Sequence, residues 1–489
     1  METVDKTVVK KQREIGIVQF GEGNFLRGFF EFMLDISNEK GLTDMSVAVV
    51  KPIELGNLEA FRAQNCVYTV LLRGMQNGQA VEERRIVTCI DHVVDSYLEY
   101  ADYIALAKLP GIKAVVSNTT EAGIVYDDTD IIEGAPPKTF PGKLTQFLFE
   151  RWKAFGGAGD KGLVILPAEL IEKNGEKLRG CVMKFASLWE LPGDFVKWID
   201  QSCIFCNTLV DRLITGYPAA DAQELCDKWG YEDNLIVTGE PFALFVIESE
   251  KLDEVAALFP FDRAGLPVVF TNDVTPYRER KVRLLNGAHT GIVLGAFLAG
   301  FDTVGECMND ETVRTCLERM MREEIAPTVP LPQNEVDAFS ASVIERFSNP
   351  FIHHMLLSIA LNSVSKWKSR ILPSMLDFKQ ATGRLPRLLV FSFAALLAFY
   401  TSERWDGNSL IGKREAKSYP IKDDKDVLEF FAQCSGLDAD EYVRRAAAHT
   451  AFWGQDLTAV EGFCGMASGF LKDIRGSGAK AAIEKAMNN

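Results

Sequence analysis

The sequence predicts an α/β domain built on a largely parallel sheet, followed by an all-α domain. In the first half, six short apolar runs are bounded by turn residues and mostly separated by segments of helical length, as in parallel strands joined by crossover helices. The runs are residues 15–20, 46–50, 112–116, 163–166, 235–237 and 268–270. A chain of 489 residues also exceeds what one hydrophobic core usually serves. We expect one domain over residues 1–272 and a second over residues 273–489.

A β-hairpin is expected within the first domain. Runs 68–72 and 81–89 flank Asn77-Gly78, a dipeptide that favours the positive φ angles of a tight hairpin turn. We predict that this hairpin is inserted in the sheet.

Helical patterns fill the second half of the chain. They cover residues 278–300, 310–324, 335–346, 350–367 and 385–400. The apolar stretch within the last of these is about thirteen residues long, short of the roughly twenty that cross a bilayer, so it is expected to be a buried core helix. A cleft between the two halves is the expected place for chemistry.

The charge balance argues against two classes of partner. The chain has 68 acidic and 53 basic residues, a formal net charge of -15, which opposes nonspecific binding to nucleic acid or to an anionic membrane. The charged residues 1–14 do not form a secretory signal. We therefore expect a cytoplasmic protein, a monomer or a small homo-oligomer, with a small molecule as its substrate.

Metal binding is not expected. Ten cysteines are scattered along the chain, and the one close pair, Cys203 and Cys206, supplies too few ligands for a zinc site. The apolar residues between them predict a buried strand instead. His353 and His354 are adjacent and would point to different faces of a helix, whereas a metal needs three or four converging ligands.

A glycine-containing turn follows the first predicted strand. Residues 15–20 run into Gly21 and Gly23, and a helical pattern begins soon after. Two glycines let the backbone turn tightly and approach a pyrophosphate, whose charge is favoured by the amides at a helix amino terminus. The third glycine of the common dinucleotide fingerprint is replaced by Leu26. The context predicts a Rossmann-like domain with a dinucleotide cofactor.

The second strand ends differently from most NAD-binding domains. An acidic residue usually follows it and holds the ribose hydroxyls, but this chain has Lys51-Pro52 there. Because a lysine is also suited to a 2′-phosphate, NAD and NADP both remain open on physical grounds.

Three polar residues share one side of a helix at the start of the second domain. Lys281, Asn286 and His289 lie within roughly 140° of arc at about 100° per residue. Each alone has an ordinary structural explanation. Together they fit catalysis, because a lysine in an apolar cleft has a lowered pKa and acts as a base near neutral pH, while an asparagine amide stabilises a developing oxyanion.

These residues resemble a known family, the polyol-specific long-chain dehydrogenases typified by mannitol dehydrogenase. The lysine-x4-asparagine-x2-histidine signature of that family matches Lys281, Asn286 and His289, and implies a base, an oxyanion donor and a substrate-positioning group. A second motif around Asn207 implies a second oxyanion donor. The resemblance covers nearly the whole chain and implies an NAD-dependent oxidoreductase.

The resemblance also implies a set of binding residues. For the cofactor these are Gly21, Gly23, Asn24, Phe25, Arg27, Thr120 and Glu121. For the substrate they are Lys366, in the family's substrate-side motif, and Arg283 and Glu240. Arg283 belongs to a cationic segment with Arg278, Arg280 and Lys281, from which one arginine, or else Lys366, is expected to pair with a substrate carboxylate.

The expected substrate pair is tagaturonate and altronate, because three further segments, 117–123, 139–144 and 166–172, are most similar to the branch of the family that acts on sugar acids. Fructuronate with mannonate, or a hexitol or its phosphate, are the alternatives. A different class of function is a non-catalytic dinucleotide-binding regulator, since a fold alone does not fix function.

Overall fold

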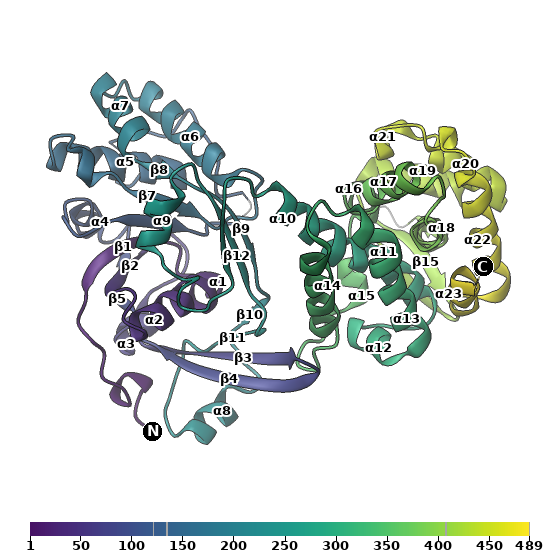
Figure 1. The fold of residues 1–489 in the computed structure, drawn as a ribbon, viewed down its shortest axis with the longest axis horizontal. Coiled ribbons are helices and arrows are strands. Elements are labelled where there is room, and N and C mark those ends of the chain that lie inside the picture. Colours follow the sequence, from purple (N-terminus) through teal and green to yellow (C-terminus); the bar gives the residue numbers. More distant parts are fainter. Residues whose placement is uncertain (121, 134, 406–407, 489) are drawn as a thin grey trace. The chain divides into compact units, whose positions relative to one another are not determined.

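The computed structural model describes residues 1–120, 122–133, 135–405 and 408–488, shown in Figure 1. The chain divides into two compact units. The first comprises residues 1–73 and 81–274, and the second comprises residues 74–80 and 275–489.

The main sheet of the first unit has six parallel strands in the order β5-β2-β1-β6-β7-β8. Counted along this sheet alone, the order is 3-2-1-4-5-6, that of the doubly wound dinucleotide-binding fold. The strands are β1 (Glu14–Phe20), β2 (Met45–Lys51), β5 (Ile90–Asp95), β6 (Ala114–Ser117), β7 (Val164–Pro167) and β8 (Ile204–Phe205). The predicted Rossmann-like domain is confirmed.

Both faces of this sheet are buried, which explains why its strands appear in the sequence as continuous apolar runs. Ile17 of β1 faces one core, whereas Val18 and Phe20 face the other, because successive side chains of a strand point to opposite sides. The first core also receives Phe29, and the second receives Phe147. The helices and 3-10 turns of the unit are η1 (Val4–Lys6), α1 (Asn24–Leu26), η2 (Arg27–Glu31), α2 (Phe32–Glu39), α3 (Glu59–Ala63), α4 (Tyr100–Leu106), α5 (Phe140–Ala154), η3 (Gly159–Lys161), α6 (Asn174–Leu188), α7 (Gly193–Ser202), α8 (Ala222–Trp229) and α9 (Leu252–Leu258).

The predicted hairpin forms, but it is not inserted in the main sheet. Asn77 and Gly78 have φ angles of 52° and 74°, as a tight turn of this kind requires. The hairpin strands belong to a separate sheet, in the order β10-β11-β3-β4. Its strands are β3 (Tyr68–Gln76), β4 (Gln79–Val87), β10 (Ile214–Gly216) and β11 (Val237–Gly239).

The last two apolar runs were also wrongly placed in the main sheet. Residues 235–237 contribute to β11, which pairs with the hairpin strand β3, and residues 268–270 form β13 in a third sheet. The third sheet contains β9 (Asn207–Asp211), β12 (Leu244–Glu248) and β13 (Val268–Thr271). Apolar runs reveal that a strand is buried but not which partner it pairs with.

The second unit is mostly helical, but the prediction that it is all-α was wrong. A three-stranded antiparallel sheet of β14 (Ser402–Trp405), β15 (Leu410–Arg414) and β16 (Lys417–Ile421) follows the buried helix α18. Strand β14 is half-buried to exposed and polar, so it lacks the apolar alternation that marks a strand in a sequence.

The helices of this unit surround α18, whose side chains are nearly all buried, as expected for residues 388–400. Helices α11 and α22 pack against it. Among the described residues, no helix is both long and apolar enough to span a membrane. The helical segments are α10 (Thr275–Arg280), η4 (Lys281–Asn286), α11 (Gly287–Leu298), α12 (Val304–Asn309), α13 (Glu311–Arg319), η5 (Met320–Ile325), η6 (Ala326–Thr328), α14 (Gln333–Phe347), α15 (Leu356–Ile359), α16 (Ser363–Arg370), α17 (Leu372–Thr382), α18 (Arg387–Tyr400), α19 (Lys425–Cys434), α20 (Ala439–Ala447), α21 (Thr450–Trp453), η7 (Leu457–Ala459), α22 (Phe463–Ser477) and α23 (Ala479–Asn488).

A buried carboxylate caps α18. Glu324 accepts hydrogen bonds from the backbone amides of Leu388 at 2.9 Å and Leu389 at 2.8 Å. These amides have no partner within the helix, and a carboxylate at a helix amino terminus also matches the helix dipole. Burial nevertheless raises the pKa of Glu324 from 4.5 to about 7, despite these hydrogen bonds, which favour the charged form.

This raised pKa predicts a pH-dependent stability. The folded protein binds the Glu324 proton more tightly than the unfolded chain, so the contribution is fully present below pH 4.5 and is lost as the pH rises to about 7. We expect Glu324→Gln to remove up to about 3 kcal/mol of this pH dependence. Urea unfolding at pH 5 and pH 8 measures it. The half-exposed Glu318→Gln serves as the control, and an identical pH dependence in wild type and Glu324→Gln would contradict the assignment.

Candidate functional site

The first glycine of the cofactor turn is required by the backbone. Gly21 follows β1 with a φ of +110°, in a region that side chains rarely adopt. A Cβ atom there would lie 2.7 Å from the carbonyl oxygen of Asn118, which follows β6. Strands β1 and β6 are neighbours at the point where the strand order reverses, and ligands of open α/β sheets bind at this point.

The second glycine opens space at the start of a helix. Gly23 has an ordinary φ of -64°, and a Cβ atom there would meet nothing within 4 Å. Helical structure then continues from α1 through the π-helical η2 into α2, and the first turn contains no acidic residue. The amides of this turn therefore keep their preference for an anion such as a pyrophosphate.

Gly28 has a role that the sequence analysis missed. A Cβ atom on Gly28 would lie 2.7 Å from Cδ1 of Ile214 and 3.0 Å from Cγ1 of Val237. Close packing between helix and strand is the role of the third glycine of the dinucleotide fingerprint. Gly28 allows close packing of the same kind, but against β10 and β11 of the second sheet, and its presence in the sequence was the available signal.

Arg27, predicted to contact the cofactor, is held inside the protein by its own partners. Its guanidinium donates to the carbonyl of Leu235 at 2.7 Å and to Oδ1 of Asn24 at 2.5 Å, and the Phe61 and Tyr68 rings lie 5.3 Å from it. Burial lowers its pKa. Arg27 therefore orients the Asn24 amide in the turn.

Phe25 is half-buried in the same turn. Its ring stacks on Phe29 at a centroid distance of 4.9 Å. This contact fixes the first helical turn after Gly23.

The loop after β6 is strained and anchored. Thr120 is exposed with a φ of +101°, an outlier for a β-branched residue of the kind that occurs at ligand sites. The buried Glu169 accepts hydrogen bonds from the hydroxyls of Ser117 and Thr119 at 3.1 and 3.0 Å. Burial raises the pKa of Glu169. Glu121, also predicted to bind the cofactor, lies outside the described residues.

Lys51 does not present a cation at the end of β2. Its buried ammonium lies 3.0 Å from the carboxylate of Asp95 at the end of the neighbouring β5. It also donates to the carbonyls of Ile53 and Glu54 at 2.7 and 3.0 Å. The charge that would attract a 2′-phosphate is therefore neutralised within the protein.

Lys281 and Asn286 lie at the two ends of a π-helical stretch, η4, rather than on the regular α-helix that was expected. In a π-helix the hydrogen bonds join residues five apart, which is the spacing of these two side chains. Both are half-buried. Single π-helical turns within α-helices occur frequently at functional sites.

His289 lies one helical turn further on, in α11. Its ring stacks on Phe347 at 4.0 Å and meets the edge of His354 at 5.3 Å. Its buried Nε2 has no hydrogen-bond partner among the described residues. Burial lowers the pKa of His289 well below its usual value, and the nearby positive charges of Arg346, Arg370 and Lys366 act in the same direction. The imidazole is therefore neutral near pH 7.

Asn207 is buried at the start of β9 in the first unit. Its amide donates to the carboxylates of Glu176 at 3.0 Å and Glu248 at 2.7 Å, and its oxygen accepts from the backbone amide of Glu176. Both of its donor positions are thus held by carboxylates, partners that sequence spacing did not reveal.

Two predicted substrate residues, Arg283 and Glu240, have partners within the protein. Arg283 is neutralised by Asp377 at 2.5 Å and lies 3.5 Å from Glu279, so its guanidinium stabilises the helical unit. Glu240 is 2% exposed and accepts a hydrogen bond from the backbone amide of Leu213 at 2.6 Å. These contacts give both residues a structural role, and their contacts with the substrate stay predictions.

Lys366 is half-buried in α16, and its ammonium donates to the carbonyl of Ile359 at 2.9 Å.

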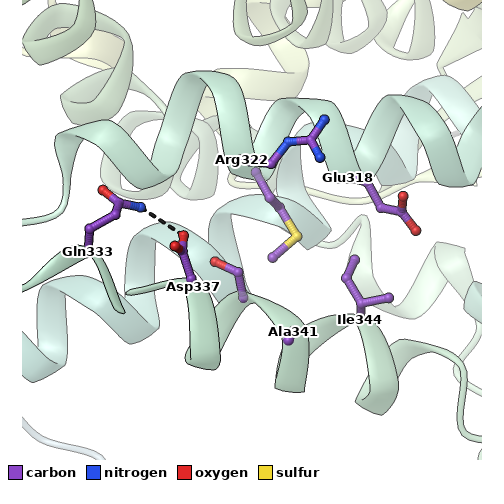
Figure 2. A pocket seen from close by; sticks show the side chains of 8 residues that line it. Glu318, Arg322, Gln333, Asp337, Ala341 and Ile344 are labelled. Carbon is purple, nitrogen blue, oxygen red and sulfur yellow. Dashed lines mark hydrogen bonds between the residues drawn. The ribbon is translucent and has the colours of Figure 1, made fainter. Parts of the chain in front are cut away.

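A separate open pocket of about 470 Å³ lies between α14 and the segment from α13 to η5, where Figure 2 shows Asp337 and Ile344 facing Arg322 and Glu318. None of the predicted site residues lines it. In the part of the chain that the structure describes, no group of three or more histidine, cysteine, aspartate or glutamate residues could hold a metal ion.

Comparison with known proteins follows the same division of the chain. A family model described as the mannitol dehydrogenase Rossmann domain matches residues 15–257, and one described as the mannitol dehydrogenase C-terminal domain matches residues 273–474. The chain belongs to the mannitol dehydrogenase family. As a member of that family it is a dehydrogenase, an oxidoreductase enzyme.

Curated proteins of known name are similar over nearly the whole chain. A protein named altronate oxidoreductase from Yersinia enterocolitica is 42% identical over 474 residues, covering 96% of each chain. One of the same name from an Enterobacter species is 41% identical over 476 residues, again covering 96% of each.

Two solved structures share the fold of this chain. D-sorbitol dehydrogenase in substrate-free form has a TM-score of 0.79 at 22% identity, covering 96% of this chain and 95% of its own. Mannitol 2-dehydrogenase from Pseudomonas fluorescens, in a ternary complex with NAD and D-mannitol, has a TM-score of 0.68 at 23% identity, covering 98% of this chain and 95% of its own.

Proposed function

We propose that this chain is an NAD-dependent oxidoreductase that interconverts D-tagaturonate and D-altronate. The substrate assignment is supported by the 42% identity, over 96% of the chain, to proteins named altronate oxidoreductase. The motif that carries the chemistry, Lys281 with Asn286, is intact and lies in a π-helical turn.

The cofactor assignment rests on the glycine turn and on Lys51. The open space beside Gly23 and the helix start that follows it fit a pyrophosphate. Because Asp95 neutralises Lys51, no lysine charge at the end of β2 favours the 2′-phosphate of NADP. The turn residues Asn24 and Phe25, with Thr120 from the strained loop, complete the proposed cofactor site. When bound, the nicotinamide would donate or accept the hydride.

In the reductive direction, the ammonium group of Lys281 donates a proton to the ketone oxygen of the substrate as the carbonyl carbon receives the hydride. The amide of Asn286 donates a hydrogen bond to that oxygen as negative charge develops on it. Asn207 is proposed as a second donor, which requires exchange of one of its carboxylate partners for the substrate oxygen. In the oxidative direction, neutral Lys281 accepts the hydroxyl proton.

His289 is proposed to position a substrate hydroxyl. Because its imidazole is neutral and Nε2 is buried without a protein partner among the described residues, this nitrogen is suited to one hydrogen bond with a ligand. The ring stack on Phe347 holds the imidazole plane fixed.

A spectrophotometric screen tests the substrate. NADH oxidation is followed with tagaturonate, fructuronate, fructose and fructose 6-phosphate, and we expect tagaturonate to have a kcat/KM at least about a hundredfold above fructose. This ratio corresponds to about 3 kcal/mol, which charged hydrogen bonds to a carboxylate supply. NADPH in place of NADH is the cofactor control. Equal rates on tagaturonate and fructose would reduce the assignment to a general polyol dehydrogenase.

A further inference from the structure

Two cations on one face of α16 have no carboxylate partner among the residues that the structure describes. Lys366 and Arg370 are four residues apart, so their side chains are neighbours on the helix. Both are half-buried, and among the described residues no carboxylate lies within ion-pair distance of either. Arg283 and Arg414 in the same unit each pair with an aspartate, at 2.5 and 2.7 Å. Like charges at this spacing destabilise a helix unless an anion compensates them.

Arg370 faces the helix that contains the proposed catalytic residues. Its Nη1 lies 3.4 Å from Oγ1 of Thr290, whose hydroxyl donates to the backbone oxygen of Asn286 at 2.9 Å. The end of α16 packs closely against the start of α11, since a Cβ atom on Gly287 would lie 3.1 Å from the carbonyl oxygen of Arg370. Arg370 is thus linked through one hydroxyl to Asn286.

A buried ring nitrogen of His289 lies in the same region. Nε2 of His289 has no hydrogen-bond partner among the residues described, and the charges of Arg370 and Lys366 are near enough to depress the pKa of this histidine. Burial also lowers the pKa of Lys366 and of Arg370. The acidic residue that acts on Lys366, Asp423, is itself held by the Tyr400 hydroxyl and the amide of Val364. An unsatisfied acceptor or donor beside uncompensated cations indicates a site for an anionic, hydroxyl-bearing ligand.

We propose that Arg370, together with Lys366, binds the substrate carboxylate and so selects a sugar acid over a neutral ketose. A guanidinium binds a carboxylate through two parallel hydrogen bonds, a bidentate geometry that a single ammonium does not provide. The inference rests on the proposed function for the identity of the substrate, and it pairs Lys366 with Arg370 in place of an arginine of the segment 278–283.

The test compares the wild type with Arg370→Met and Arg370→Lys on tagaturonate and on tagatose, the neutral ketose of the same configuration. We expect Arg370→Met to lower kcat/KM for tagaturonate about a hundredfold and to leave that for tagatose within threefold. Arg370→Lys should keep part of the selectivity, because it retains charge but not the bidentate geometry. Lys368→Ala, an exposed lysine of the same helix, is the matched control and should match the wild type.

Equal losses on both ketoses would show that Arg370 only supports the fold, and an unchanged tagaturonate rate would remove it from the site. If fructose 6-phosphate is the substrate that loses most, the site binds a phosphate and the carboxylate proposal falls. If the wild type has a higher kcat/KM for fructuronate than for tagaturonate, the proposed substrate is wrong. The role of Arg370 is then tested by comparing kcat/KM for fructuronate and for fructose in the wild type and in Arg370→Met. Calorimetric titration of altronate into the NAD-loaded enzyme checks binding independently of turnover, and Arg370→Met should weaken it.

Discussion

Replacing Lys281 with alanine is expected to remove most turnover while leaving NADH affinity near the wild-type value. The lysine transfers a proton to or from the substrate oxygen, and a positioned acid–base group typically contributes about 10²- to 10⁴-fold. Lys281 lies in the second unit, whereas the glycine turn lies in the first. Steady-state kinetics with tagaturonate and calorimetry with NADH measure the two effects separately.

Lys281→Arg is the matched control for this substitution. Arginine keeps the positive charge but does not release a proton at accessible pH, so we expect it to be nearly as inactive as alanine. Substantial activity in Lys281→Arg would mean that Lys281 acts through charge alone. Turnover of Lys281→Ala within threefold of wild type would contradict the catalytic role.

Gly23→Val is expected to weaken NADH binding at least about tenfold, roughly 1.4 kcal/mol, in a protein that still folds. The φ of -64° suits any residue, and the Cβ position is open in the protein itself, so the added side chain competes only with the pyrophosphate. Calorimetric titration with NADH measures the loss of affinity, and a thermal melt followed by circular dichroism shows whether the variant still folds.

Gly21→Val provides the contrast within the same turn. Its φ of +110° and the Asn118 carbonyl 2.7 Å from the Cβ position predict lost stability, whatever its effect on the cofactor. If Gly23→Val keeps both its melting temperature and its NADH affinity, the dinucleotide site lies elsewhere in the chain.

Most strands of the main sheet were predicted because both of their faces are buried, and the hairpin strands were predicted from the turn at Asn77-Gly78. The buried strand β12 was missed. Strands β1, β2, β6 and β7 appear as apolar runs because both of their faces meet a hydrophobic core. Strand β5 contains Asp91 and His92 and lacks such a run. Pairing partners could not be predicted, because the hairpin strand β3 and its partner β11 are far apart in the sequence.

Within the candidate site, local motifs were visible but long-range partners were not. Nothing in the spacing of residues 278–289 distinguishes a π-helical turn from a regular helix. Arg283 and Arg370 are both arginines in helical segments, and only the presence of Asp377 beside one of them decides which is neutralised. The spacing of Lys366 and Arg370 was the one signal in the sequence that favoured Arg370.

The π-helical stretch η4 also constrains how this part of the chain can change in length. Asn286 lies five positions after Lys281, and loss of any of the four residues between them would convert the wide turn to an ordinary α-helical one. The buried face of α11 would hold its place against α18, so the preceding turn with Lys281 would rotate by about 100° relative to Asn286. Single-residue deletions between these positions are therefore expected to be tolerated less well than substitutions of the four intervening residues.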